Sequence, residues 1–274
     1  YESSSETKHN KINFYPFTTP TDLLSFPLLS PFQKIRASAL LAFLKCSPFL
    51  TFYEHMTAQE FLKKTMGQDT WNIVWKELFR KKFGKYAGNI VASFIWSRIK
   101  KRTRSLGYIE GGFQSFIDHL ESTVQKQGVV IKKNHTITSL KKKGDMISVD
   151  GEMFDAVIST FPTPILIRLT HHFFPQKYHS RLTRINYLHA HNLIIETKQP
   201  FLNKIYWLNI MIPHIPFTVM VQHTHFIDKK NYNNHHLVYI GNYLERNDPR
   251  MNMNIDEIVN HFLPHIQKIT QNKP

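Results

Sequence analysis

The secondary structure is predicted most clearly for residues 107–164, whose sequence is GYIEGGFQSFIDHLESTVQKQGVVIKKNHTITSLKKKGDMISVDGEMFDAVISTFPTP. Directly after the double glycine Gly111-Gly112, apolar residues recur at a spacing of three or four, which places them on one face of a helix. They are Phe113, Phe116, Ile117, Leu120 and Val124. Gly128 supplies the left-handed residue at which such a helix ends. The pattern therefore predicts one amphipathic helix between these glycines.

Short apolar runs joined by turn residues follow the helix. Val129 to Ile131 predicts a buried strand directly after Gly128, and a second strand is expected from about Ile137 to Leu140. The chain then turns at Gly144-Asp145 and again at Asp150-Gly151, which favours a hairpin. A last apolar run, Ala156 to Ile158, precedes a proline-rich stop. The order predicted for this segment is helix, strand, hairpin and strand.

The same residues resemble the central part of the FAD-dependent amine-oxidase-like flavoproteins. The features that carry the resemblance are Gly111-Gly112 before the helix, the step from Asn134 to Ile137, the basic hairpin, the run Asp155 to Ile158 and the Ser-Thr-x-Pro tail at 159–162. The family includes protoporphyrinogen oxidase, the monoamine oxidases and the carotenoid-type desaturases. The resemblance implies that this segment returns the chain from a substrate domain to an FAD domain. It also implies that the backbone of Ile137 lies against the adenine of FAD.

Within this resemblance the expected cofactor is FAD, bound without a covalent link. The implied cofactor-binding residues are Gly111, Gly112, Ile137, Thr160 and Pro162. A Rossmann site also needs a G-x-G-x-x-G turn that brings pyrophosphate to a helix N-terminus, and no such motif follows a predicted strand here. In the family that motif lies near the beginning of the protein, and another FAD-contacting segment lies near its end. We therefore expect the chain, which begins with Tyr1, to be an internal fragment with an incomplete FAD site and no activity of its own.

Composition narrows the class of protein. An apolar share of 42% with 13% aromatic residues excludes a disordered chain. The single cysteine, Cys46, excludes an intramolecular disulfide and fits a reducing compartment. We recognise no signal peptide, and the apolar run Ala39 to Leu44 is too short to span a bilayer. We therefore expect a cytoplasmic protein.

The net charge of +15 raises the question of an anionic partner. The clusters Lys100 to Arg104 and Lys141 to Lys143 are candidates for phosphate contacts. However, the second cluster lies at the expected hairpin tip, where charge keeps a strand edge soluble. Lys, Asn and Ile are also frequent along the whole chain, which indicates a general compositional bias. A basic nucleic-acid-binding module is therefore a disfavoured alternative.

Two capping boxes mark helices in the first 106 residues, one at Ser30 to Gln33 and one at Thr57 to Glu60. Two interpretations of the first helix stay open, because its apolar surface is dense. It is either buried in a substrate domain or makes peripheral contact with a membrane beside a lipophilic substrate. Farther along, Trp96-Ser97-Arg98-Ile99 is similar to the helical substrate region in a bacterial branch of the family. Arg98 is therefore a candidate substrate contact, with a cation in a last helical turn as the alternative.

After residue 164 a strand-rich half is expected. Apolar segments predict antiparallel strands at 189–196, 204–212, 217–227 and 236–243, and an apolar stripe predicts a closing helix at 255–269. Tyr206 and His223 lie in strings similar to the bacterial branch and are candidate substrate-facing residues, with ordinary sheet residues as the alternative. We assign no catalytic side chain, because hydride transfer to a flavin needs positioning and electrostatics rather than a nucleophile.

Histidines two residues apart suggest a metal site. His189 with His191 and His223 with His225 would each project from one face of a strand, and two such pairs on neighbouring strands suit zinc or iron. However, no Asp or Glu directly adjoins either pair to orient the rings. The sixteen histidines are also spread over the whole chain. We therefore predict no metal site.

Together the patterns predict an α/β fold with α+β character. A helical and antiparallel-sheet substrate domain (1–106 and 165–274) would be interrupted by a partial, Rossmann-like FAD-binding segment (107–164). The resemblance implies hydride transfer from a small-molecule substrate to FAD, with the remainder of the FAD domain as a partner. The alternatives are a flavin-dependent isomerase resembling UDP-galactopyranose mutase, the nucleic-acid module, and a non-catalytic remnant. The hypothesis requires Ile137 to face an open cleft.

Overall fold

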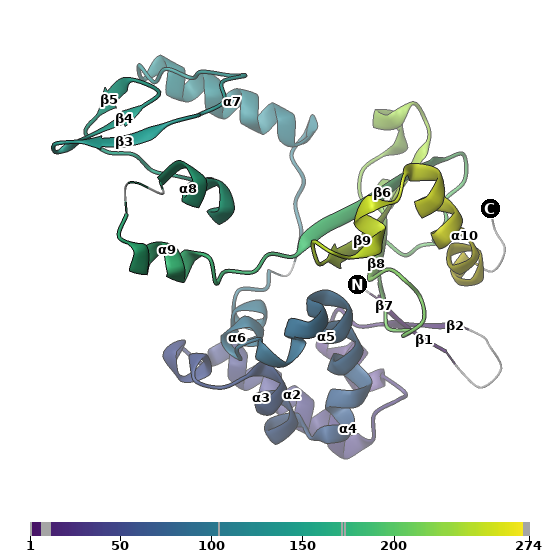
Figure 1. Cartoon of the computed structure of the whole chain (residues 1–274). Coiled ribbons are helices and arrows are strands. Elements are labelled where there is room, and N and C mark those ends of the chain that lie inside the picture. Colours follow the sequence, from purple (N-terminus) through teal and green to yellow (C-terminus); the bar gives the residue numbers. More distant parts are fainter. Residues whose placement is uncertain (1, 7–11, 104, 171, 173, 271–274) are drawn as a thin grey trace. The chain divides into compact units, whose positions relative to one another are not determined.

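The computed structural model describes residues 2–6, 12–103, 105–170, 172 and 174–270 (Figure 1). The chain divides into two compact units. The first unit combines residues 1–106 with 188–274, and the second contains residues 107–187. Helices and mainly antiparallel sheets are both present in the described residues, which confirms the α+β character.

The first unit contains a helical part. Its helices are α1 (Pro20–Ser25), α2 (Pro31–Cys46), α3 (Ala58–Met66), α4 (Gln68–Thr70), α5 (Lys76–Phe83) and α6 (Ser93–Lys100), with 3₁₀ turns at Thr51–Glu54 and Gly84–Asn89 and a π-helical turn at Trp71–Trp75. Both predicted capping boxes form, at Ser30 and at Thr57. Among the described residues, no helix combines the length and apolar character needed to cross a membrane.

An aromatic core holds these helices together. Tyr53 is almost fully buried, and its ring stacks on Trp96 with the ring centroids 6.1 Å apart. The indole Nε1 of Trp96 donates a hydrogen bond to the carbonyl oxygen of Ser47 (2.9 Å). Because the buried polar group of the indole has a partner, the ring contributes its full apolar area to the core without an unsatisfied donor.

A six-stranded sheet completes the first unit, with strand order β2-β1-β7-β8-β9-β6. The strands are β1 (Glu2–Glu6), β2 (Ile12–Pro16), β6 (His189–Thr197), β7 (Trp207–Ile210), β8 (Val219–Gln222) and β9 (His236–Leu244). Neighbouring strands are antiparallel except β1 and β7, which are parallel. The antiparallel pairing expected of the strands after residue 164 is confirmed for β6, β7, β8 and β9. Strand β1 forms because its main chain pairs with both β2 and β7, which its polar sequence does not reveal.

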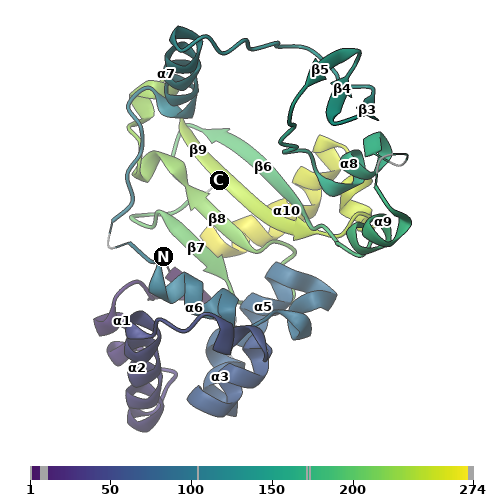
Figure 2. The same cartoon turned by 90° about the vertical axis from the view of Figure 1, so that its left-hand side faces the viewer.

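Helix α10 (Ile255–Thr270) covers one face of this sheet, and Figure 2 shows it behind the strands. Its buried side chains Ile258, Phe262 and Ile266 pack with alternate residues of the strands. The sheet residues in this core include Leu208, Ile210, Met220, Val238 and Ile240. The helix predicted for 255–269 is confirmed, with its apolar stripe facing the sheet.

The second unit contains α7 (Gly112–Lys126), a three-stranded sheet of β3 (Leu140–Lys143), β4 (Met146–Val149) and β5 (Glu152–Phe154), and the helices α8 (Thr163–Thr170) and α9 (Gln176–Leu182). The predicted helix and both predicted turns are confirmed. The runs Val129–Ile131 and Ala156–Ile158, however, form no strand, so these two predictions are wrong. A strand needs a neighbour for its main-chain groups, and no described residue pairs with either run.

The second unit extends beyond residue 164, where the predicted segment ended, to Tyr187. Helix α8 contacts β3 and α9. The hydroxyl of Tyr187 accepts a hydrogen bond from the backbone N–H of Thr163 at the start of α8 (3.1 Å). These contacts attach α8 and α9 to the hairpin, which the local sequence pattern could not show.

Candidate functional site

A hollow in the second unit is lined by two of the predicted cofactor residues, Ile137 and Thr160. It encloses about 180 Å³. Its walls are Ile137, Leu140, Val149, Val157, Ile158, Ser159, Thr160 and Phe161. Pockets that enclose a drug-sized ligand measure about 300–1,000 Å³, so this hollow suits one ring system rather than a whole dinucleotide. Ile137 thus borders an open recess, as the hypothesis requires.

Asp150 fixes the chain beside Ile137. Its carboxylate accepts hydrogen bonds from the hydroxyl of Thr138 (2.8 Å) and from the backbone N–H groups of Thr138 (3.1 Å) and Ser139 (2.7 Å). These hydrogen bonds, led by that of the Thr138 hydroxyl, hold the pKa of Asp150 below its usual value. Asp150 was recognised from the sequence only as a turn residue. Its role in positioning the backbone at 137–139 depends on contacts eleven and twelve residues away.

The remaining predicted cofactor residues lie outside the lining of the hollow. Gly111 has φ 76° and caps α7, and Gly112 has φ 84°. A Cβ atom at Gly111 would collide with the side chain of Ser115. The carbonyl of Pro162 accepts hydrogen bonds from Ile165 (2.9 Å) and Leu166 (3.2 Å) at the start of α8. These residues therefore have local structural roles, and their contact with a cofactor stays a prediction.

In the first unit, the sheet face opposite α10 is polar and aromatic. Strand alternation places Trp207, Asn209 and Tyr239 on this face. The indole Nε1 of Trp207 donates a hydrogen bond to Oδ1 of Asn209 (3.1 Å). The predicted residue His223 extends the face, because its ring lies 5.5 Å from that of Tyr239. This face offers aromatic ring surfaces and hydrogen-bonding groups.

The two predicted residues at this sheet are themselves engaged. His223 is buried, its Nε2 atom lies 2.7 Å from the hydroxyl of Tyr232, and burial lowers its pKa, which favours the neutral ring. The ring of Tyr206 packs on Phe226, with centroids 5.0 Å apart. The backbone carbonyl of Tyr206 also accepts a hydrogen bond from Gln222 N–H (2.8 Å). Trp207 and Tyr239 were not selected from the sequence, because only the register of the strands brings them to one face.

The third predicted substrate contact, Arg98, lies beside a second cation. Its guanidinium is 5.2 Å from the centroid of Phe94, and the ammonium of Lys82 is 5.4 Å from the same ring. The ring of Tyr243 is 5.6 Å from that ammonium. Burial first, and then repulsion by Arg98, lower the pKa of Lys82 to about 8. Among the described residues no carboxylate pairs with either cation, so the pair is suited to an acidic group on a ligand.

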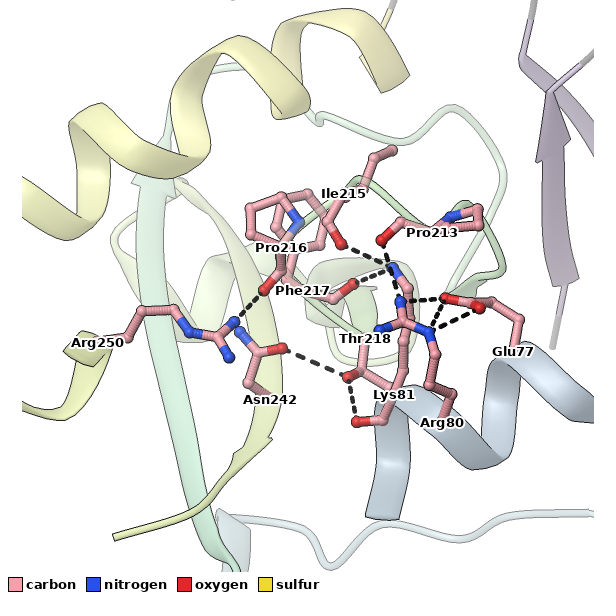
Figure 3. Close-up of polar contacts among 10 residues, drawn as sticks. All are labelled: Glu77, Arg80, Lys81, Pro213, Ile215, Pro216, Phe217, Thr218, Asn242 and Arg250. Atoms are coloured by element: carbon pink, nitrogen blue, oxygen red, sulfur yellow. Dashed lines mark hydrogen bonds and ion pairs between the residues drawn. The ribbon is translucent and has the colours of Figure 1, made fainter. Parts of the chain in front are cut away.

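Neighbouring basic residues of α5 join the helical part to the sheet (Figure 3). Nζ of Lys81 donates hydrogen bonds to the carbonyl oxygens of Ile215 (2.8 Å) and Phe217 (3.0 Å), and Arg80 donates to that of Pro213 (3.0 Å). From the other side, Arg250 donates to the carbonyl of Pro216. Four carbonyl groups of one loop thus receive charged donors, which fixes the loop between β7 and β8.

The histidine pairs do not form the metal site considered from the sequence. His189 and His191 lie on β6, but His223 and His225 lie in a 3₁₀ turn after β8, so the strand predicted for 217–227 ends early. Moreover, β9 separates β8 from β6. Within the described ranges, no group of three or more His, Cys, Asp or Glu side chains is placed to hold a metal ion.

Solved structures share this fold. An oxidoreductase from Methanosarcina mazei has a TM-score of 0.72 and 16% sequence identity, with 99% of this chain and 65% of that chain covered. A protein proposed to be a protoporphyrinogen oxidase, from Exiguobacterium sp. 255-15, has a TM-score of 0.61 and 14% identity, with 100% and 65% covered. Putrescine oxidase bound to putrescine has a TM-score of 0.63 and 12% identity, again with 100% and 65% covered.

No protein-family model matches the sequence, and no curated protein matches it significantly. The comparison therefore rests on structural similarity alone. At sequence identities this low, structural similarity establishes the fold. The chain shares the fold of these three structures, as the resemblance seen in the sequence led us to expect. It spans about 65% of the length of each of the three proteins.

Proposed function

We propose that the chain is the substrate-domain portion of an FAD-dependent oxidoreductase of the amine-oxidase type, together with one segment that contacts the nucleotide half of FAD. The likeness to an oxidoreductase over 99% of the chain gives this proposal its main support. When bound, the flavin would accept a hydride from a C–N or C–C bond of the substrate. The residues of this chain would bind and orient cofactor and substrate.

The hollow in the second unit fits the adenine part of FAD. Ile137, Val157 and Phe161 offer apolar surface to a flat ring, and the hydroxyl groups of Ser159 and Thr160 offer hydrogen-bond partners. Pyrophosphate binding would need a glycine-rich turn at a helix N-terminus, and the sequence has no such motif after a strand. The residues present therefore fit one part of the cofactor, and we expect weak binding of FAD to this chain.

Exposed apolar surface on the second unit supports a polypeptide partner. Ile158 is 91% exposed and Val130 is 79% exposed. The apolar stripe of α7 is also exposed, at Phe113, Phe116, Ile117 and Leu120. Large exposed apolar patches mark interaction surfaces, and the runs 129–131 and 156–158 have the composition of buried parallel strands. The proposed partner is the polypeptide that completes the flavin-binding domain.

The substrate would lie on the first unit. The aromatic and polar sheet face formed by Trp207, Asn209 and Tyr239 provides ring surfaces and hydrogen bonds. Arg98, next to Lys82, would bind an acidic group of the substrate, if it has one. The isomerase alternative has less support, because reduced UDP-galactopyranose mutase matches with a TM-score of 0.57, below those of the three structures named above.

A nucleotide titration tests the cofactor assignment. The ¹⁵N-labelled chain would be titrated with AMP, FAD and FMN while amide resonances are followed by NMR. Because the hollow is assigned to adenine, AMP and FAD should shift the resonances of residues 137–140 and 157–161, and FMN should not. The variant Ile137→Asp places a charge in the hollow and should abolish the AMP shifts. Val130→Asp, which alters an exposed residue outside the lining, should bind AMP like the wild type.

Circular dichroism of both variants checks that α7 and the rest of the chain remain folded. FMN shifts equal to those of AMP, or AMP binding retained in folded Ile137→Asp, would refute the assignment of the hollow. Absence of AMP binding in the wild type would refute it as well. Tight, stoichiometric FAD on the purified chain would contradict the incomplete site.

A further inference from the structure

Three histidine rings lie where helix α10 meets the loop between β7 and β8 (residues 211–218). His261 and His265 are about one turn apart on α10, with their ring centroids 6.5 Å apart. His214 of the loop has its ring centroid 6.4 Å from that of His265. We call these three residues the histidine cluster. Because imidazole gains its charge between about pH 8 and pH 5, mild acid can add several positive charges at this one place.

The charges that act on His265 from other described residues are all positive. They come from His214, His261, Lys268 and Lys81. Burial first, and then these neighbours, lower the pKa of His265. The arrangement therefore favours the neutral ring of His265, although an imidazole in water is mostly protonated in mild acid.

The loop beside the cluster already receives three cations. Lys81 and Arg80 of α5, and Arg250, donate hydrogen bonds to its carbonyl oxygens (Figure 3). Two described carboxylates lie nearby, and each is bonded to one of the arginines, Glu77 to Arg80 (2.9 Å) and Asp248 to Arg250 (2.8 Å). Protonated histidines would therefore add charge where the neighbouring carboxylates are already engaged.

Pro264 weakens α10 within the cluster. It lies in the interior of the helix, between His261 and His265. A proline has no backbone N–H, so the carbonyl of Asn260 lacks the donor that it would otherwise have four residues farther on. Helices bend and open most easily at such a position. Residues 265–270 are therefore the part of α10 that can separate from the rest.

Apolar contacts hold this end of α10 on the sheet. Ile266 and Ile269 are buried in the core of the sheet, together with Ile212 and Ile215 of the loop. The C-terminal end of a helix also attracts cations, which would oppose separation, but Lys268 already lies in the last turn and the attraction fades beyond it. Apolar burial and repulsion between cations thus act in opposite directions on the same end of the helix.

We propose that the histidine cluster is a pH-sensitive release for α10, in which protonation below about pH 6 frees residues 265–270 from the loop by opening the helix at Pro264. Release uncovers part of the apolar core under α10. It also removes the support of the loop that joins β7 to β8, and β7 carries Trp207 and Asn209 on the opposite face of the sheet. The release is independent of flavin binding and of the proposed reaction.

The direction of the pH dependence follows from the protons bound in each state. Because the pKa of His265 is lowered in the closed state, the open state binds that proton more tightly, and closure weakens as the pH falls below the ordinary value of 6.5. One histidine that stays neutral when closed changes the opening equilibrium by at most about tenfold between about pH 7.5 and pH 5.5. We therefore expect about three- to tenfold more opening over this range.

Hydrogen exchange followed by mass spectrometry measures the opening. Protection of residues 265–270, corrected for the chemical exchange rate, should fall about three- to tenfold from about pH 7.5 to pH 5.5, while that of α3 should not change. Sodium chloride at about 0.5 M should reduce the fall, because it screens partly exposed charges. His261→Gln combined with His265→Gln removes two titrating rings, so this variant should keep its protection in acid.

The matched control is His55→Gln, which removes an exposed histidine of the same unit outside the cluster and should behave like the wild type. Circular dichroism checks the fold of the double variant. If that variant does not fold, His261→Gln alone, at an exposed position, should show a smaller fall than the wild type.

Wild-type protection of residues 265–270 that is equal at the two pH values would overturn the proposal. An undiminished fall in the folded histidine variant, or a fall that salt does not reduce, would overturn it as well. Loss of the fall in His55→Gln would contradict the role of the cluster. A fall of the same size in α3 would do so too, because it would indicate unfolding of the whole unit rather than release of one helix end.

Discussion

Lys81 links protonation to the stability of the first unit. Its ammonium donates hydrogen bonds to the carbonyls of Ile215 and Phe217, while burial lowers its pKa from 10.5 to about 8. The folded state therefore binds the Lys81 proton less tightly than the unfolded state. Stability rises with pH wherever the unfolded state binds more protons. For Lys81 this window extends from about pH 8 to pH 10.5, so raising the pH through it should stabilise the fold.

The magnitude follows from the same values. Inside the window, each pH unit changes the free energy of unfolding by about 1.4 kcal/mol. We expect a rise of about 2 kcal/mol between about pH 7 and pH 9.5. Lys82 adds a smaller rise, because burial also lowers its pKa to about 8 but more of its side chain meets solvent. Urea unfolding followed by tryptophan fluorescence measures this unit alone, because Trp71, Trp75, Trp96 and Trp207 all belong to it.

Two variants isolate the lysine. Lys81→Met keeps the length of the side chain and removes the titrating group, so the rise with pH should shrink by about 2 kcal/mol. Lys76→Met removes an exposed cation from the same helix, and its rise should match that of the wild type. The reasoning would be refuted by a wild-type stability that is flat or falls over this pH range. A rise in Lys81→Met as large as in the wild type would refute it equally.

Two further substitutions test the packing of the sheet, with the same urea assay. A Cβ atom at Gly241 would lie 2.8 Å from Cγ1 of Val219 and 3.0 Å from Oδ1 of Asn192, so Gly241→Ala should lower the free energy of unfolding by about 1–3 kcal/mol. An unchanged urea midpoint would contradict this prediction, because it would mean that the neighbouring strands accommodate the Cβ atom without a loss of stability. Phe262 is fully buried against Phe217, so Phe262→Ala should lower that free energy by about 3–5 kcal/mol. A loss below about 1 kcal/mol would mean that α10 does not cover the sheet as described.

Local patterns predicted much of the secondary structure correctly. The apolar spacing of α7 and α10, the capping boxes at Ser30 and Thr57, and the turn at Gly144-Asp145 all depend on residues a few positions apart. Such features are visible in the sequence because both partners of each interaction are close together in it. The failures share a cause as well. The runs 129–131 and 156–158 have strand composition, but a strand also needs a neighbouring chain, which composition does not supply.

The residues of the candidate site were likewise predicted only in part from the sequence. The resemblance selected Ile137 and Thr160, and the structure brings both to one hollow. It could not select Asp150 as the residue that holds Thr138, nor Trp207 and Tyr239 as neighbours on a sheet face. These relations follow from strand register and turn geometry, which a single sequence does not specify. The contact of the other predicted residues with a cofactor or substrate stays a prediction.

The sequence by itself determined the apolar stripes, the caps and turns, the excess of positive charge and the order of features that resembles a flavoprotein. Only the tertiary structure decided that one face of α2 is covered and the other exposed, and that β1 pairs with β7. It also decided that the ammonium of Lys81 meets carbonyl groups 134 and 136 residues away. The physical reason is that burial and long-range hydrogen bonds depend on which segments meet, whereas helix periodicity and capping depend only on neighbours along the chain.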